Sequence, residues 1–93
     1  MSQQDIIDRG SRAEKLLSDK DLDGAFSNVK LAIYSAIDAA PVRATQGIMQ
    51  LKLMLKLLRD VRANLEEAVR SGKLERATIE QEEKQRRFKL FGR

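Results

Sequence analysis

The chain has 93 residues, of which 42% are hydrophobic and 34% charged, and its formal net charge is +4. It contains no cysteine and no histidine, which excludes disulfides, thiolate metal sites and catalysis by the commonest general base. With 5 glycines and 1 proline, the composition predicts a single all-α domain. No enzymatic activity is expected, because the sequence has neither His nor Cys and contains no G-x-G-x-x-G, Walker loop or nucleophile elbow. The sequence contains no run of 18 apolar residues, so we expect no transmembrane helix. The first residues lack the apolar core of a secretory signal.

Charge is distributed unevenly along the chain. Residues 1–40 contain five basic and seven acidic side chains, and residues 41–93 contain 13 basic and seven acidic ones. The local balances are therefore −2 and +6. Residues 84–93 contain five basic side chains and no acidic one. Such charge asymmetry is typical of a chain with a segment that binds a partner. The asymmetry carries no information about the fold.

The first predicted helix covers residues 3–17. Its apolar side consists of Ile6, Ile7, Gly10, Ala13, Leu16 and Leu17. Gly10 destabilises a helix interior by roughly 1 kcal/mol relative to alanine. Two interpretations stay open, close approach of another helix backbone or a weak point in a short helix.

A break is predicted at residues 18–24, where the sequence reads SDKDLDG. Ser18, Asp19 or Asp21 can accept hydrogen bonds from the free N–H groups that begin the next helix. The segment also matches the first half of a calcium-binding loop, D-x-D-x-D-G. The twelfth loop position, which requires a bidentate glutamate, is Lys30. Capping is therefore favoured over calcium, and no cofactor or metal is predicted.

The second predicted helix runs from about residue 22 to residue 39. Its apolar stripe consists of Leu22, Ala25, Phe26, Val29, Ala32, Ile33, Ala36, Ile37 and Ala40. Pro41 ends it, because the residue before a proline is forced out of the helical conformation. The connection that follows is short, which predicts an antiparallel helical hairpin with the next helix.

The third predicted helix begins at Val42 or Ala44, ends at Arg70 and forms the centre of the fold. Its main stripe consists of Ile48, Leu51, Met54, Leu55, Leu58, Val61, Leu65, Ala68 and Val69. Leu53 and Leu57 lie off this stripe. They are candidates for an oligomer face, the alternative being a wide helix buried on all sides. Ser71 and Gly72 form the predicted stop, with Gly72 as a left-handed C-cap.

Lys52, Lys56 and Arg59 form a basic stripe on this helix, which Arg62 extends. Such a stripe can follow a phosphate backbone. The alternative is an ordinary solvated face. We favour the solvated face, because no recognition helix or aromatic stacking platform accompanies the stripe.

The chain from residue 73 onward is predicted to be a polar helix with a basic tail. The tail residues Arg86, Arg87, Phe88, Lys89, Leu90 and Phe91 are the candidate partner-binding site. Their apolar area is too small to offset the entropy of ordering the backbone. We therefore expect the tail to be unstructured until it binds a partner with an apolar groove and an acidic rim. A basic amphipathic tail on an anionic membrane is an alternative.

These elements predict two parts, a three-helix bundle at residues 1–72 and the polar helix with its interaction tail at residues 73–93. The fold class is all-α, a small helical bundle in which a long central helix belongs to an antiparallel helical hairpin.

Residues 9–29 resemble small uncharacterised helical proteins of tailed bacteriophages. The shared pattern, R-x-x-R-A-E-x-L-L-x-[DN] followed by A-F-x-x-[VL], is met by Arg9, Arg12, Ala13, Glu14, Leu16, Leu17, Asp19, Ala25, Phe26 and Val29. A later V-x-x-G-K-[LI] element is similar at Val69, Gly72, Lys73 and Leu74. The turn after the second helix is shorter here than in that pattern, and some aromatic residues that the pattern leads us to expect in the second helix are missing. The resemblance implies a role in the virion or its assembly and transfers no catalytic residue.

The expected function is that of a non-enzymatic structural or assembly protein, a minor virion component associated with the head, portal or tail. Its expected partners are further copies of itself and other structural proteins, in the virion or the host cytoplasm. The alternative is an accessory protein that binds nucleic acid through the basic half of the chain.

Overall fold

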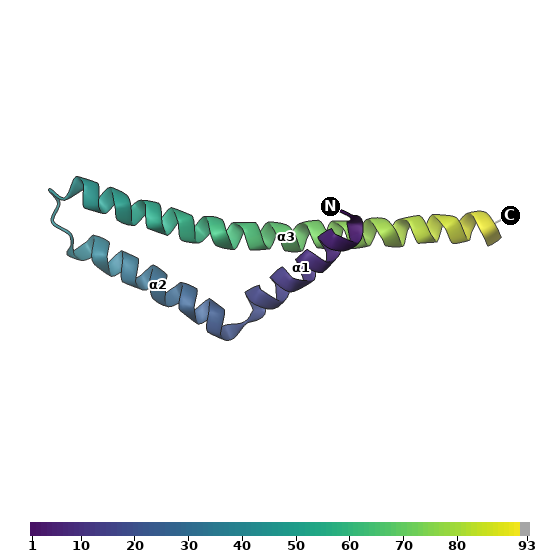
Figure 1. Ribbon diagram of the computed structural model, residues 1–93, viewed down its shortest axis with the longest axis horizontal. Coiled ribbons are helices and arrows are strands. Elements are labelled where there is room, and N and C mark those ends of the chain that lie inside the picture. The colour runs from purple at the N-terminus through teal and green to yellow at the C-terminus, as the bar shows by residue number, and fades with distance from the viewer. Residues whose placement is uncertain (92–93) are drawn as a thin grey trace. The chain divides into compact units, whose positions relative to one another are not determined.

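The computed structural model describes residues 1–91, with the backbone alone at Phe91. The described chain consists of three helices and contains no strand: α1 (Gln3–Ser18), α2 (Lys20–Ala39) and α3 (Thr45–Phe91) (Figure 1). The predicted all-α class is confirmed.

Side-chain caps begin the first two helices. The Ser2 hydroxyl accepts a hydrogen bond from the Asp5 N–H at 3.1 Å, and the Asp5 carboxylate accepts one from the Ser2 N–H at 3.3 Å. Before α2, Asp19 Oδ1 accepts from the N–H groups of Asp21 at 2.8 Å and Leu22 at 3.1 Å. These bonds satisfy N–H groups that have no partner within their helix. The predicted capping by residues 18–21 is confirmed for Asp19, and α2 begins two residues earlier than expected.

The end of α2 agrees with the prediction made from Pro41. The helix ends at Ala39, and Ala40 has an extended backbone with φ −71° and ψ 135°. The Ala40 N–H still donates to the carbonyl oxygens of Ala36 and Ile37, at 3.1 and 3.2 Å. A short connection then leads to α3.

The predicted stop at Ser71 and Gly72 is wrong. The helix α3 continues through both residues to Phe91, and no glycine in the described chain has a positive φ. A single glycine destabilises a helix by only about 1 kcal/mol, and good helix formers flank this one. The predicted polar helix at residues 73–83 is therefore part of α3. The tail at residues 84–91, which was expected to be unstructured without a partner, is helical.

The chain forms two compact units. Unit one consists of residues 1–15 and of α3 from Leu65 onward, and unit two consists of residues 16–64. The boundaries between the units fall inside α1 and α3. The predicted division into residues 1–72 and residues 73–93 is a statement about which parts fold independently. It stays a prediction.

Unit one is organised around a close contact between Gly10 of α1 and Gly72 of α3. A Cβ atom added to Gly10 would lie 2.8 Å from the Ala68 carbonyl oxygen and 2.9 Å from the Gly72 Cα. Ile7, Ala13 and Ala68 are buried beside this contact. Of the two interpretations of Gly10, close approach of another helix is therefore confirmed.

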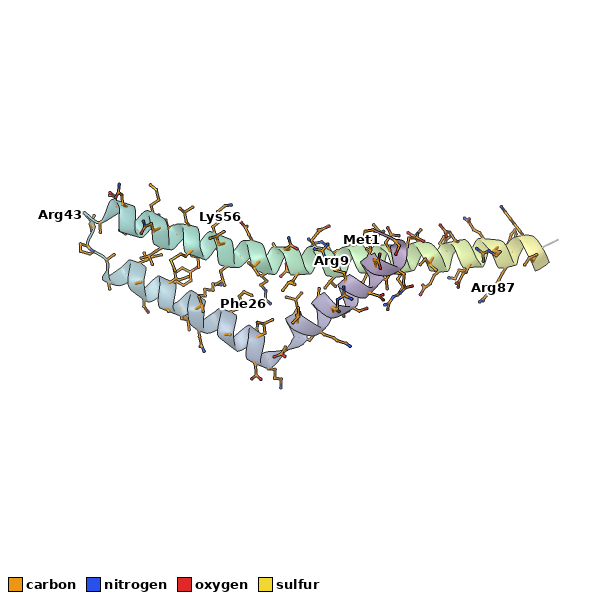
Figure 2. All side chains as sticks on the ribbon, in the orientation of Figure 1. Met1, Arg9, Phe26, Arg43, Lys56 and Arg87 are labelled. Carbon is orange, nitrogen blue, oxygen red and sulfur yellow. The ribbon has the colours of Figure 1, made fainter. Side chains whose placement is uncertain are left out.

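Unit two holds α2 against the part of α3 that ends at Asn64. Its buried side chains are Ile33 and Leu55, each less than 9% exposed. Half-buried side chains surround them: Leu22, Phe26, Ile37, Ile48, Leu51 and Leu58. Phe26 lies on the side of α2 that faces α3 (Figure 2). Polar pairs border this contact, Asp23 with Arg62 at 3.1 Å and Tyr34 with Arg59 at 3.3 Å.

Candidate interaction surfaces

Much of the apolar surface of the described chain is exposed. No large side chain is fully buried, and the buried hydrophobic residues are Ile7, Ala13, Ile33, Leu55 and Ala68. Extended apolar patches are uncommon on monomeric proteins, and where they occur they often bind another molecule. The exposed apolar residues are therefore the candidates for interaction surfaces.

The largest group of exposed apolar side chains in unit two lies on α3. It consists of Met49, Leu53, Met54, Leu57 and Val61, which we call the outer face. Leu53 and Leu57 are 54% and 64% exposed, whereas Leu55 is 7% exposed. Because successive residues advance by about 100° around a helix, Leu57 lies roughly 200° from Leu55. The outer face therefore points away from the contact with α2.

Two residues of the outer face were assigned to the wrong stripe. The apolar periodicity of the sequence grouped Met54 and Val61 with the buried residues, but both are at least half exposed. Their spacing from Leu57, three residues before and four after, was the available signal. Residues at that spacing share one helix face.

Charged residues lie along one flank of the outer face. Lys56 Nζ is 3.3 Å from an Asp60 carboxylate oxygen, and the two side chains are 70% and 58% exposed. The pair follows the four-residue spacing of neighbouring side chains on a helix. Met54 lies on the opposite, apolar flank, whereas Lys56 and Asp60 share their flank with Met49.

The predicted phosphate-binding stripe consists largely of side chains with partners in unit two. Arg59 donates to the Tyr34 hydroxyl, Arg62 pairs with Asp23, and Lys56 pairs with Asp60. Lys52 is exposed on the same helix. Basic side chains increase the affinity for nucleic acid when they neutralise phosphates and release the bound counterions. Because three residues of the stripe already pair with other side chains, we expect the stripe to add less affinity for nucleic acid.

The predicted partner-binding residues lie together at the end of α3. Phe88 and Leu90 are 72% and 70% exposed, and Arg86, Arg87 and Lys89 are exposed as well. Figure 2 shows Arg87 on this last part of the helix. The side chain of Phe91 lies outside the described residues. We call residues 84–91 the terminal segment.

A shallow depression borders Phe88 in the terminal segment. It is lined by Lys84, Gln85, Phe88 and Lys89, which belong to adjacent turns of α3. An aromatic ring with lysines on both sides presents apolar area and positive charge together. Such a surface is suited to a partner that offers an apolar pocket with acidic groups around it.

Nearly all carboxylates of the described chain are exposed, and only Glu75 is half-buried. Glu67 accepts a hydrogen bond from Arg70 at 2.8 Å and a longer one from the Ser71 hydroxyl. The Arg70 hydrogen bond and charge lower the pKa of Glu67 below its ordinary value. Glu67 and Arg70 form a surface ion pair. A carboxyl group that transfers protons near neutral pH needs a raised pKa, so this pair does not indicate acid–base catalysis.

The half calcium motif is engaged in structural contacts. Asp19 caps α2, and Asp23 pairs with Arg62. Among residues 1–91 no group of three or more acidic side chains is placed to hold a metal ion. None of the helices in that range is long and apolar enough to cross a membrane.

Comparison with protein-family models, with curated proteins and with solved structures gave no match.

Proposed function

We propose that this protein is a non-enzymatic assembly component that associates with itself and with other structural proteins. In this proposal α2 and the first part of α3 act as an antiparallel helical hairpin within a small bundle. The outer face of α3 serves self-association, and the terminal segment anchors the bundle to a further partner.

One observation carries the proposal: large apolar side chains are exposed in two separate groups on α3. Leu57 represents the outer face and is 64% exposed, and Phe88 represents the terminal segment and is 72% exposed. Each group combines apolar side chains with charges at its edge. Protein interfaces have this composition, an apolar centre with a polar rim.

The proposed setting is a bacteriophage particle, in which the protein is a minor component of the head, portal or tail. The support for it is the resemblance of residues 9–29 to small phage proteins. Assembly parts of this kind need rigid helices and repeated contacts, and the described chain is built from three helices.

Nucleic acid is the second candidate partner, because the terminal segment bears Arg86, Arg87 and Lys89 in exposed positions. The presence of Phe88 and Leu90 among these residues favours a protein partner, since phosphate binding needs no apolar anchor. Binding to phosphates also weakens steeply with salt, whereas an apolar interface changes little.

Two variants of the terminal segment test the proposal. The first changes Phe88 and Phe91 to alanine, and the second changes Arg86, Arg87 and Lys89 to glutamine. Incorporation into particles is measured by co-sedimentation after expression with the other structural proteins of the same genome. We expect the phenylalanine variant to lose most incorporation, and the charge variant to associate more slowly with a weaker dependence on salt.

The opposite ranking would identify nucleic acid as the partner. In that case the charge variant loses binding, the phenylalanine variant retains it, and the affinity for duplex DNA falls steeply with salt. Unchanged incorporation of both variants would remove the terminal segment from the proposed function.

A further inference from the structure

We propose that the outer face of α3 binds the outer face of a second copy of this chain in antiparallel orientation, with Leu57 at the two-fold axis. This inference rests on the self-association in the proposed function, and it specifies the partner, the orientation and the register of that contact.

The centre of the outer face, Leu53, Leu57 and Val61, is symmetric in sequence about Leu57, whereas Met49 and Met54 have no counterpart within the face. Four residues to either side lie Leu53 and Val61, and seven residues to either side lie Gln50 and Asn64. In a two-fold contact, if one residue contacts another across the interface, the reverse contact also forms. Leu53 of each copy therefore meets Val61 of the other, and the amides of Gln50 and Asn64 meet at the two ends. The centre of such a contact is apolar and its ends are polar.

The charges beside the outer face select the antiparallel orientation. A two-fold axis perpendicular to the helices brings the same flank of both copies together. Lys56 lies one residue before Leu57, and Asp60 lies three residues after it. Lys56 of one copy and Asp60 of the other are then offset by about 3 Å along the helix axis. Two reciprocal ion pairs form between the copies, in place of the pair that each chain forms within itself.

A parallel pair lacks these contacts. In parallel helices the charged flank of one copy meets the apolar flank of the other, so Lys56 would lie near Met54 and Asp60 near Val61. The charges would then lose water without gaining a partner. Because both orientations bury the same apolar residues, the charged pair decides between them.

The exposure of these residues leaves the contact accessible. Leu57 is 64% exposed, and the Lys56 and Asp60 side chains are 70% and 58% exposed. The opposite side of this part of α3 holds Leu55 and packs on α2, so a second copy does not compete with the core of unit two. Leu57 at the centre is the expected anchor of the contact.

The first test compares two leucines of nearly equal exposure. Leu57→Glu places two carboxylates next to each other at the two-fold axis, whereas Leu31→Glu alters a residue of α2 that is 63% exposed and lies outside the outer face. Sedimentation equilibrium measures the dimer Kd, and circular dichroism verifies that each variant is folded. We expect Leu57→Glu to raise the Kd at least about 30-fold and Leu31→Glu to leave it nearly unchanged.

The second test determines the orientation and uses the absence of cysteine from the chain. Leu53→Cys and Val61→Cys are prepared separately and oxidised alone or as a mixture. Leu53 and its counterpart are offset by about 12 Å in the antiparallel dimer, too far for a disulfide. We expect crosslinking only in the mixture. A parallel dimer in register would crosslink Leu53→Cys with itself.

The third test measures the reciprocal ion pairs. Lys56→Asp and Asp60→Lys each place like charges across the antiparallel contact and are expected to weaken the homodimer. Mixing the two variants restores opposite charges across the contact, so the heterodimer should form in preference to either homodimer. Equal Kd values for the heterodimer and both homodimers would overturn the assigned flank contact.

The outcomes separate this inference from the proposed function. A dimer that resists Leu57→Glu, or that crosslinks Leu53→Cys with itself, overturns the inference and leaves assembly through the terminal segment in place. A protein that stays monomeric at all concentrations overturns both the inference and the proposed self-association. Loss of incorporation in the phenylalanine variant, with an unchanged dimer, leaves the inference standing.

Discussion

Gly10 and Gly24 differ in their surroundings, although both lie inside helices. A Cβ at Gly10 would meet backbone atoms of Ala68 and Gly72 at 2.8 and 2.9 Å. Backbone atoms of a packed helix cannot move aside as a flexible side chain can. At Gly24 nothing lies within 4 Å of the added atom. The same substitution therefore has opposite effects at the two positions.

We predict that Gly10→Ala destabilises the protein by about 1–3 kcal/mol, because overpacking outweighs the gain in helix propensity. Gly24→Ala is the matched control and should stabilise by about 0.5–1 kcal/mol. Thermal unfolding followed by circular dichroism measures both. A stabilised Gly10→Ala variant would show that the two helices are not in close contact.

The Glu67 carboxyl group offers a test of local electrostatics. Its pKa is lowered by the hydrogen bond and the charge of Arg70. A lowered pKa in the folded state contributes stability above the pKa of the unfolded state, and this contribution is lost as the pH falls through the folded value. The pair is solvent-exposed, so its contribution to the total is small.

We predict that Arg70→Gln raises the pKa of Glu67 toward its ordinary value. Titration of the side-chain carboxyl by nuclear magnetic resonance, from neutral to strongly acidic pH, measures this directly. Lys73→Gln, one turn further along the helix, is the control and should change the pKa less. Equal effects of the two variants would contradict a specific Arg70 contact.

At the scale of the helix, the N-cap of α2 is the contact that the sequence indicates most directly. Asp19 Oδ1 accepts two backbone hydrogen bonds, at 2.8 and 3.1 Å. We predict that Asp19→Ala lowers stability by about 1 kcal/mol and that Asp19→Asn retains most of it, because asparagine also caps well. Chemical unfolding measures the difference. An Asp19→Ala variant with parent stability would show that the cap is replaced by water.

The α2–α3 contact of unit two depends on Leu55, which is 7% exposed. We predict that Leu55→Asp unfolds this contact, with a loss of several kcal/mol against a typical total of about 5–15 kcal/mol. Leu31→Asp, at a residue 63% exposed, should melt close to the parent. Circular dichroism melts of the two variants at one protein concentration make the comparison. If Leu55→Asp melted at the same temperature as the parent, the result would contradict the central role of α3 in the fold.

Helix ends were predictable from the sequence where the signal is local, and not where the decisive contact is distant in the chain. Asp19 and Pro41 act on neighbouring residues, so their effects were predictable. Gly72 has the same local signature as a C-cap, but Gly10 from the other end of the chain occupies the space beside it. The orientation of Met54 and Val61 likewise depends on which side of α3 packs on α2. Periodicity alone does not settle that choice when two apolar stripes adjoin.

At the scale of the whole molecule, the terminal segment contributes exposed residues and little buried area. Residues 80–90 are exposed throughout. We predict that deletion of residues 86–93 shifts the melting temperature by less than about 4 °C, which corresponds to under 1 kcal/mol. Deletion of residues 70–93 is the contrasting variant, because it removes Gly72 and the Arg76 partner of Ser11. A large loss from the shorter deletion would place the terminal segment in the core.

The division into two units has a consequence for the order in which the chain folds. Unit two is formed by one continuous stretch, residues 16–64, whereas unit one joins residues 1–15 to residues beyond 64. During synthesis unit two is complete once residue 64 has been made, whereas unit one also needs residues beyond 64. Once the contacts of unit two have formed, the effective loop that brings Gly10 to Gly72 is shorter, which lowers the entropy loss of closing it. We therefore expect the contacts of unit two to form before the distant glycine contact, and damage to unit two to delay the formation of unit one.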